Sequence, residues 1–256
     1  MKANYHTHTP RCRHAVGAER EYIERAVTGG LEILGFSDHA PFEYGVPGYD
    51  SGVRMFPEQL PEYMDTLRSL KTEYAGRIEL HAGLEAEYYP DLFPRLREMA
   101  WENGVEYLIL GQHFLGNEVN MPYCGAATED TEILRRYVDQ SIAGMETGCF
   151  TYFAHPDLIH FLGDEAAYER EMRRLCRAAM GCCLPLEFNF LGFREGRNYP
   201  DKRFWRIVAE EGNPVVFGCD AHAPEHAWSP DIERRALEYL NPLGIAQLET
   251  VPLKAI

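Results

Sequence analysis

Short apolar runs alternate with amphipathic segments along most of the chain. The apolar runs are typical of buried strands. They end near residues 5, 36, 80, 110, 154, 188 and 218, and a possible eighth run covers 246–249. Between them, apolar residues recur at three- and four-residue spacing over 18–27, 57–74, 133–145, 165–180, 201–211 and 231–240, which predicts helices. Gly29 and Gly30 end the first of these helices.

This alternation predicts one parallel sheet covered by helices. Seven or eight strand–helix units in a chain of 256 residues suit a closed barrel better than an open sheet. We therefore expect an α/β barrel formed by a single domain that spans 1–256. In such barrels the functional site lies at the C-terminal ends of the strands.

Metal-binding side chains collect at those predicted strand ends. Six of the ten histidines and two acids lie there: His6, His8, His39, His113, His155, His222, Glu85 and Asp220. A single histidine of this kind is more simply explained as a hydrogen-bonded loop residue, but so many coincidences at one rim are improbable. In His6-Thr7-His8 the alternation of a strand directs both imidazoles to one face. The sequence therefore predicts a metal centre.

The types of donor indicate which ions and which chemistry to expect. Imidazole and carboxylate ligands without thiolate suit Zn, Mn or Fe better than Mg or Ca. Two acids among many histidines suggest that a carboxylate bridges two ions. Bridged pairs of ions about 3.5–4 Å apart are a common device for phosphoester hydrolysis. The favoured class is therefore a metal-dependent phosphatase.

Composition and charge disfavour several other classes. With 40 acidic and 25 basic residues the net charge is −15, which is unfavourable for wrapping a duplex or binding a membrane surface. The acidity fits solubility, bound cations or both. The seven cysteines include no CxxC pair, so we expect reduced thiols and a cytoplasmic protein. No apolar run approaches the roughly 18 residues of a membrane span, and the first residues show no signal-peptide pattern.

Six short motifs follow one another through most of the chain. They are His6-Thr7-His8, Ser37-Asp38-His39, Gly83-Leu84-Glu85, Gly111-Gln112-His113, Ala154-His155-Pro156-Asp157 and Asp220-Ala221-His222. In this order they resemble the PHP family (polymerase and histidinol phosphatase). Cys12, His14, the Asp38-His39-Ala40-Pro41 turn and the segment after Glu187 are most similar to the monofunctional histidinol-phosphatases. The resemblance implies a distorted (β/α)7 TIM-like barrel with three divalent metal ions.

Carried over by motif, the resemblance implies three metal subsites. The first ion would take four ligands: His6, His8, Glu85 and Asp220. The second would share Glu85 and take His113 and His155. The third would take His14, His39 and His222, where His14 is chosen because its six-residue distance from His8 matches the family.

The same resemblance implies hydrolysis of L-histidinol phosphate, a reaction of histidine biosynthesis, by a hydroxide held between the first two ions. The expected catalytic residues are Glu85, Asp220 and His222. The expected substrate contacts are Arg194, Arg197, Asn189, His160 and Arg11. Arginine suits a phosphoryl group because its planar fork donates two hydrogen bonds. Asp38 and Asp157 lie beside ligand histidines, and we expect them to accept free ring N–H groups.

Three alternatives stay open. The first is a PHP phosphoesterase that acts on another small phosphomonoester or on a nucleotide. The second is the exonuclease domain of a polymerase, which the net charge of −15 disfavours. The third is a metal-binding module without activity, which the complete set of ligands disfavours. The expected partner is a small phosphomonoester rather than nucleic acid or a membrane, and the sequence leaves the oligomeric state open.

Overall fold

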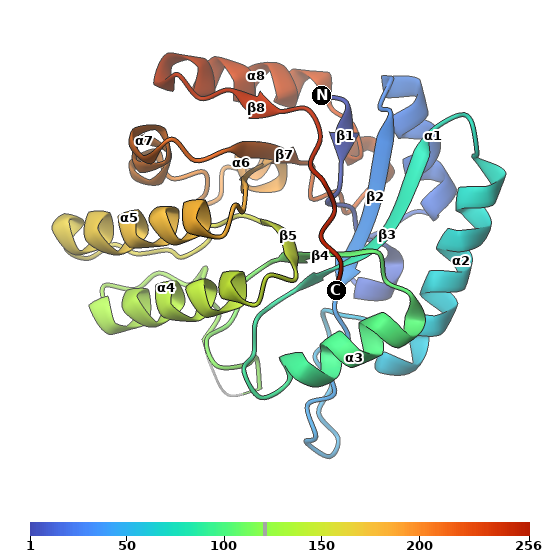
Figure 1. Cartoon of the computed structure of the whole chain (residues 1–256), viewed down its shortest axis with the longest axis horizontal. Coiled ribbons are helices and arrows are strands. Elements are labelled where there is room, and N and C mark those ends of the chain that lie inside the picture. The colour runs from blue at the N-terminus through green and yellow to red at the C-terminus, as the bar shows by residue number, and fades with distance from the viewer. Residues whose placement is uncertain (120–121) are drawn as a thin grey trace.

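Eight parallel strands form one curled sheet, and their order in the sheet is their order in the chain (Figure 1). The computed structural model describes residues 1–119 and 122–256. The strands are β1 (Ala3–Asn4), β2 (Ile33–His39), β3 (Glu79–Ala86), β4 (Tyr107–Leu110), β5 (Phe150–Phe153), β6 (Leu186–Asn189), β7 (Val215–Gly218) and β8 (Gln247–Leu248). The predicted TIM-like α/β fold is therefore confirmed.

Main-chain hydrogen bonds close the sheet beyond β1 and β7. Thr7 and Ala221 form a parallel bridge, in which the N–H of His8 donates to the carbonyl of Ala221 at 2.9 Å. The N–H of Ala221 donates to the carbonyl of His6 at 3.2 Å. β8 instead pairs with the first residues of β7, where Val215 is the register partner of Gln247. The closure therefore lies at the C-terminal ends of the strands, where the expected ligands are.

Helices cover the outer face of the sheet (Figure 1). The α-helices are α1 (Glu19–Gly29), α2 (Leu60–Glu73), α3 (Phe93–Asn103), α4 (Thr131–Glu146), α5 (Glu165–Gly181), α6 (Phe190–Glu195), α7 (Lys202–Glu211) and α8 (Pro230–Leu240). Short 3-10 helices are η1 (Pro10–Cys12), η2 (Pro57–Gln59), η3 (Pro224–His226) and η4 (Asn241–Leu243). All six predicted helices are confirmed, whereas α3 and the six-residue α6 were not predicted. Among the helices described, none is both long and apolar enough to cross a membrane.

Aromatic side chains fill the interior of the barrel. Tyr5, Tyr107 and Tyr152 are buried there. The Tyr107 hydroxyl donates to the carbonyls of Tyr5 at 2.7 Å and Phe36 at 3.1 Å, which ties β4 to the first two strands. The C-terminal tail adds Val251, whose carbonyl accepts a hydrogen bond from the Tyr5 hydroxyl at 3.4 Å. The tail thus runs across the barrel at the end opposite the expected ligands (Figure 1).

Gly83 provides the space that the Tyr107 ring occupies, because a Cβ at this position would overlap with the ring. We expect Gly83→Ala to lower the free energy of unfolding by about 1–3 kcal/mol, the usual cost of overpacking a core. Urea denaturation of the metal-free protein measures this. Gly181→Ala at the end of α5 is the control, since a Cβ there meets no atom within 4 Å. An equal loss in both variants would contradict the packing explanation.

Candidate metal centre

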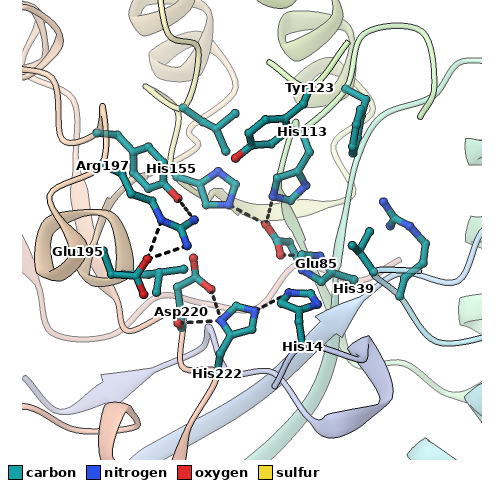
Figure 2. Close-up of a pocket in the computed structure, with 16 residues that line it drawn as sticks. His14, His39, Glu85, His113, Tyr123, His155, Glu195, Arg197, Asp220 and His222 are labelled. Carbon is teal, nitrogen blue, oxygen red and sulfur yellow. Dashed lines mark hydrogen bonds and ion pairs between the residues drawn. The ribbon is translucent and has the colours of Figure 1, made fainter. Parts of the chain in front are cut away.

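The nine expected ligands gather over the C-terminal mouth of the barrel. His39, at the end of β2, is the register partner of Glu85 in β3, so the two residues lie at one height. Six other ligands follow strand ends in the same way: His6 and His8 after β1, His113 after β4, His155 after β5, and Asp220 and His222 after β7. His14 lies in the loop after η1. Figure 2 shows Glu85 near the centre of the resulting ring.

Four side-chain atoms surround the first expected subsite. The carboxylate oxygens Glu85 Oε2 and Asp220 Oδ1 lie 3.4 and 3.6 Å from His6 Nε2. The same two oxygens lie 3.5 and 3.3 Å from His8 Nε2. Ligands of a tetrahedral ion with bonds of about 2.0–2.1 Å lie about 3.3–3.4 Å apart. The spacing therefore fits four atoms that share one cation.

The tautomer of His6 supports the same conclusion. Its Nδ1 lies 2.8 Å from Glu187 Oε1, and because an ionised carboxylate only accepts, Nδ1 carries a proton. In the neutral ring, the lone pair of Nε2 then faces Glu85 and Asp220, which also only accept. Within the described part of the chain, His6 Nε2, Glu85 Oε2 and Asp220 Oδ1 have no hydrogen-bond partner. Buried acceptors that face one another are stabilised by a cation between them.

In the absence of an ion, this subsite attracts protons. Burial opposes a charged His6, but the surrounding carboxylates, chiefly Glu187, outweigh it and raise the pKa of His6 well above its ordinary value. Burial likewise opposes a charged His8, yet hydrogen bonding to Asp220 helps to raise its pKa to about 9. Burial also disfavours an ionised Glu85, but the imidazoles around it hold its pKa well below the usual range. Metal binding therefore has to displace protons from the imidazoles.

Glu85 turns its two oxygens toward different groups of imidazoles. Oε2 faces the first subsite, whereas Oε1 lies 2.8 Å from His155 Nε2 and 3.4 Å from His113 Nε2. Glycine keeps this position open, because a Cβ at Gly111 would overlap with Glu85 Oε1. The geometry fits a carboxylate between two adjacent subsites.

His14 and His222 form the outer part of the centre. Their Nε2 atoms lie 2.9 Å apart (Figure 2). His14 Nδ1 lies 2.7 Å from the carbonyl of Cys12, and His222 Nδ1 lies 3.2 Å from that of Asp220. Since a carbonyl only accepts, each Nδ1 carries the proton and two Nε2 lone pairs face each other, an arrangement that a cation stabilises. His39 has a ring nitrogen within 4.8 Å of this pair and also belongs to the group around Glu85.

Glu187 and Asn189 of β6 hold two ligands whose backbone is strained. His155 and Asp220 have φ values of 33° and 47°, in the left-handed region that non-glycine residues rarely adopt. Glu187 Oε2 accepts from the backbone N–H of His155 at 2.9 Å and from Asn189 Nδ2 at 3.0 Å. Asn189 Nδ2 also donates to Asp220 Oδ2 at 3.1 Å. These bonds offset the strain, which costs on the order of 1–3 kcal/mol per residue.

Two further acids lie behind the ligand imidazoles. Asp38 Oδ1 lies 3.5 Å from His8 Nδ1, but the expected hydrogen bond from a ligand imidazole is not made among the described residues, and Asp38 Oδ1 accepts from the backbone N–H of His39 at 3.0 Å instead. Glu87 Oε1 lies 2.9 Å from His113 Nδ1. Neither the contact of Glu87 with His113 nor that of Glu187 with His6 was predicted. The spacing Glu85-x-Glu87 was an available signal, because residues two apart in an extended segment point to the same side.

The expected role of Asp157 is wrong. Its Oδ2 accepts from the backbone N–H of Asp201 at 2.7 Å and from the Trp205 indole at 3.0 Å. His155 Nδ1 has no hydrogen-bond partner among the described residues. Asp157 therefore fastens the start of α7 to the loop after β5.

A cavity of about 400 Å³ lies over the ligands (Figure 2). Its apolar lining includes Phe114, Leu158 and Leu191. Arg197 lies on its wall, where the guanidinium contacts the Tyr199 hydroxyl at 3.1 Å. Arg197 also forms an ion pair with Glu195 (Figure 2). The cavity thus combines ligand atoms, the two arginines Arg54 and Arg197, and an apolar surface.

The other four expected substrate contacts do not line this cavity. Arg11 forms ion pairs with Glu19 and Glu62. Asn189 is buried behind the ligands, as described above. The backbone of His160 bonds to neighbouring loops, and Arg194 is a half-buried residue of α6.

Several known proteins are similar to this chain. A model of the PHP domain matches residues 4–188. A Deinococcus radiodurans protein named probable histidinol-phosphatase is 31% identical over 233 residues, which cover 86% of this chain and 85% of the relative. A histidinol-phosphatase of Bacillus subtilis is 26% identical and is covered to 94% by the alignment, which spans 87% of this chain. The structure of Lactococcus lactis histidinol phosphate phosphatase with zinc, L-histidinol and phosphate superposes with a TM-score of 0.73, at 18% identity and 98% coverage of both chains.

The position of Glu85 between two groups of imidazoles yields a direct test. We expect Glu85→Gln to weaken metal binding at least about tenfold, because the amide cannot supply two anionic oxygens. Metal analysis after gel filtration measures the bound ions. Glu106→Gln is the control, since Glu106 bonds Lys71 and His81 at the opposite end of the barrel. Full metal content in Glu85→Gln would contradict the bridging role.

Proposed function

The chain belongs to the PHP domain family, and we propose that it is a metal-dependent phosphatase that hydrolyses L-histidinol phosphate to L-histidinol and phosphate. The observation that carries the proposal is the convergence of imidazoles and carboxylates on one mouth, beneath a cavity of about 400 Å³. Relatives named histidinol-phosphatase that align over most of this chain support this substrate.

We propose three subsites for divalent ions, with Zn, Mn or Fe as candidates. The first would be held by His6, His8, Glu85 and Asp220, the second by Glu85, His113 and His155, and the third by His14, His39 and His222. The facing acceptor atoms described above support this division. When bound, such ions lower the pKa of water to about 7 and polarise phosphoryl oxygens.

The protein's own side chains would position the ions and the substrate and supply the charge that binds them. Glu85 keeps the first two subsites adjacent, while Asp220 and His222, two residues apart, connect the first subsite to the third. Arg197 would bind the phosphoryl group, and its contact with the Tyr199 hydroxyl orients the guanidinium plane. The apolar wall near Leu158 would contact the carbon skeleton and exclude water.

Turnover tests the proposed substrate. We expect the metal-loaded protein to release phosphate from L-histidinol phosphate with a higher kcat/KM than from nucleotides or sugar phosphates, because the cavity combines an anion site with an apolar wall. Phosphate release and metal content are measured on one sample. Preference for a nucleotide would favour the alternative PHP phosphoesterase, and inactivity of a fully metallated sample would overturn the proposal.

Arg197→Lys tests the proposed phosphoryl contact. Lysine keeps the charge but loses the fork, so we expect kcat/KM to fall by about 10²-fold, as when a donor to transition-state charge is removed. Metal content should not change. Arg77→Lys is the matched control, since Arg77 makes a forked pair with Glu24 on an exposed surface. A similar fall in both variants would argue against a specific role for Arg197.

A further inference from the structure

Arg54 is a buried cation that belongs to none of the proposed subsites. It lies in the irregular loop between β2 and η2, and only 3% of its side chain is exposed. Its Nη1 donates to the carbonyl of Ala40 at 3.0 Å and to Glu87 Oε2 at 3.1 Å. Its Nη2 donates to Glu87 Oε1 at 2.8 Å and also to Glu118 Oε2. Its Nε donates to Glu118 Oε2 at 3.0 Å and to Ser51 Oγ at 3.2 Å. Every N–H direction of the guanidinium is thus used.

The partners of Arg54 come from three consecutive strand ends at the mouth. Ala40 directly follows His39 of β2, and Glu87 is two residues beyond Glu85 of β3. The third partner, Glu118, lies in the loop after β4 and is further fixed by the Tyr49 hydroxyl at 2.9 Å. One planar group therefore connects three segments that each carry an expected ligand.

Glu87 connects Arg54 to a ligand directly. Its Oε1 lies 2.9 Å from His113 Nδ1 and accepts from Arg54 Nη2 at 2.8 Å. This carboxylate therefore keeps the proton of His113 on Nδ1 and leaves the lone pair of Nε2 free for an ion. The bidentate pair with Arg54 fixes the plane of the carboxylate, and with it the orientation of the imidazole.

The cluster contributes more to geometry than to stability. Removing charges from water costs several kcal/mol per ion, and the attraction in a buried pair repays this only when the geometry is good. A buried guanidinium with two carboxylates is therefore a weak source of net stability. It does fix the relative positions of the ends of β2, β3 and β4, where His39, Glu85 and His113 come within 4.8 Å of one another.

We propose that Arg54 is a positioning residue for the metal centre, which acts through Glu87 on His113. Arg54 lines the edge of the cavity, but its N–H groups are bonded to protein oxygens of Ala40, Glu87, Glu118 and Ser51, so its role is to hold these groups in place. The inference goes beyond the proposed reaction, because it concerns how the ligands are arranged before an ion binds.

Metal titration tests this role without any substrate. Metal-free wild-type protein and Arg54→Lys are titrated with Mn²⁺, and the free ion is followed by electron paramagnetic resonance. Lysine keeps the charge but cannot make the forked contact. We expect one Mn²⁺ ion to bind about 10–100-fold more weakly, the usual effect of removing a partner of a metal ligand, while the other ions keep their affinity. Arg173→Lys is the matched control, because Arg173 also connects several acids, Glu169, Glu210 and Glu211, on the outer helices.

A merely structural role gives a different result. Arg54→Lys would then unfold at a lower urea concentration in the metal-free state but bind every Mn²⁺ ion as the wild type does, and this would overturn the proposal. If Arg54→Lys does not fold, Glu87→Gln is measured instead. It removes the charge opposite Arg54, and we expect the same single ion to bind more weakly. Unchanged affinity in Glu87→Gln would overturn the proposal as well. Because no substrate is involved, failure of this inference is separable from failure of the proposed function.

Discussion

The structure depends on one buried carboxylate in a ring of imidazoles. Glu85 is 1% exposed, and each of its oxygens faces ring nitrogens from other strands. Such a group is stable only if positive charge is close by, whether from protons or from a metal ion. The barrel must therefore bring all these strand ends to one height, which its parallel register and the Thr7–Ala221 bridge achieve.

The strand ends and their ligands could be predicted because the apolar runs and the residues that follow them are neighbours in the sequence. Apolar runs identify strands, and the barrel rule places whatever follows them at one mouth. His39, Glu85, His113 and His155 all follow this rule. His14 does not, since it lies in the loop after η1, and it was found through the resemblance to a family. The structure places it 2.9 Å from His222, as that resemblance implies.

The residues that hold the ligands in place could not be predicted, because their partners are distant in sequence. Arg54 is 33 residues from Glu87 and 64 from Glu118, and no periodicity connects them. Asp157 illustrates the opposite error. Its position beside His155 suggested a contact, yet the chain turns after Pro156 and directs the carboxylate to Trp205. Adjacency in sequence is a weak guide to contact where the backbone leaves a regular strand.

The net charge of −15 and a phosphate-binding role are compatible because the relevant field is local. At physiological ionic strength, charges more than about 8 Å apart in solvent are largely screened, so the acidic surface has little effect inside the mouth. Three divalent ions would carry more positive charge than Glu85 and Asp220 can offset. The buried acids Glu187 and Asp38 would reduce the excess, and so would the net negative charge of the cluster of Arg54, Glu87 and Glu118. This matters because repulsion between cations is strong where water is excluded. With three ions bound, a modest positive potential would remain at the cavity, suited to a phosphomonoester that carries about two negative charges at neutral pH. Since that potential would come from the ions themselves, occupancy of the metal subsites and affinity for the phosphoryl group would be coupled by the same electrostatics.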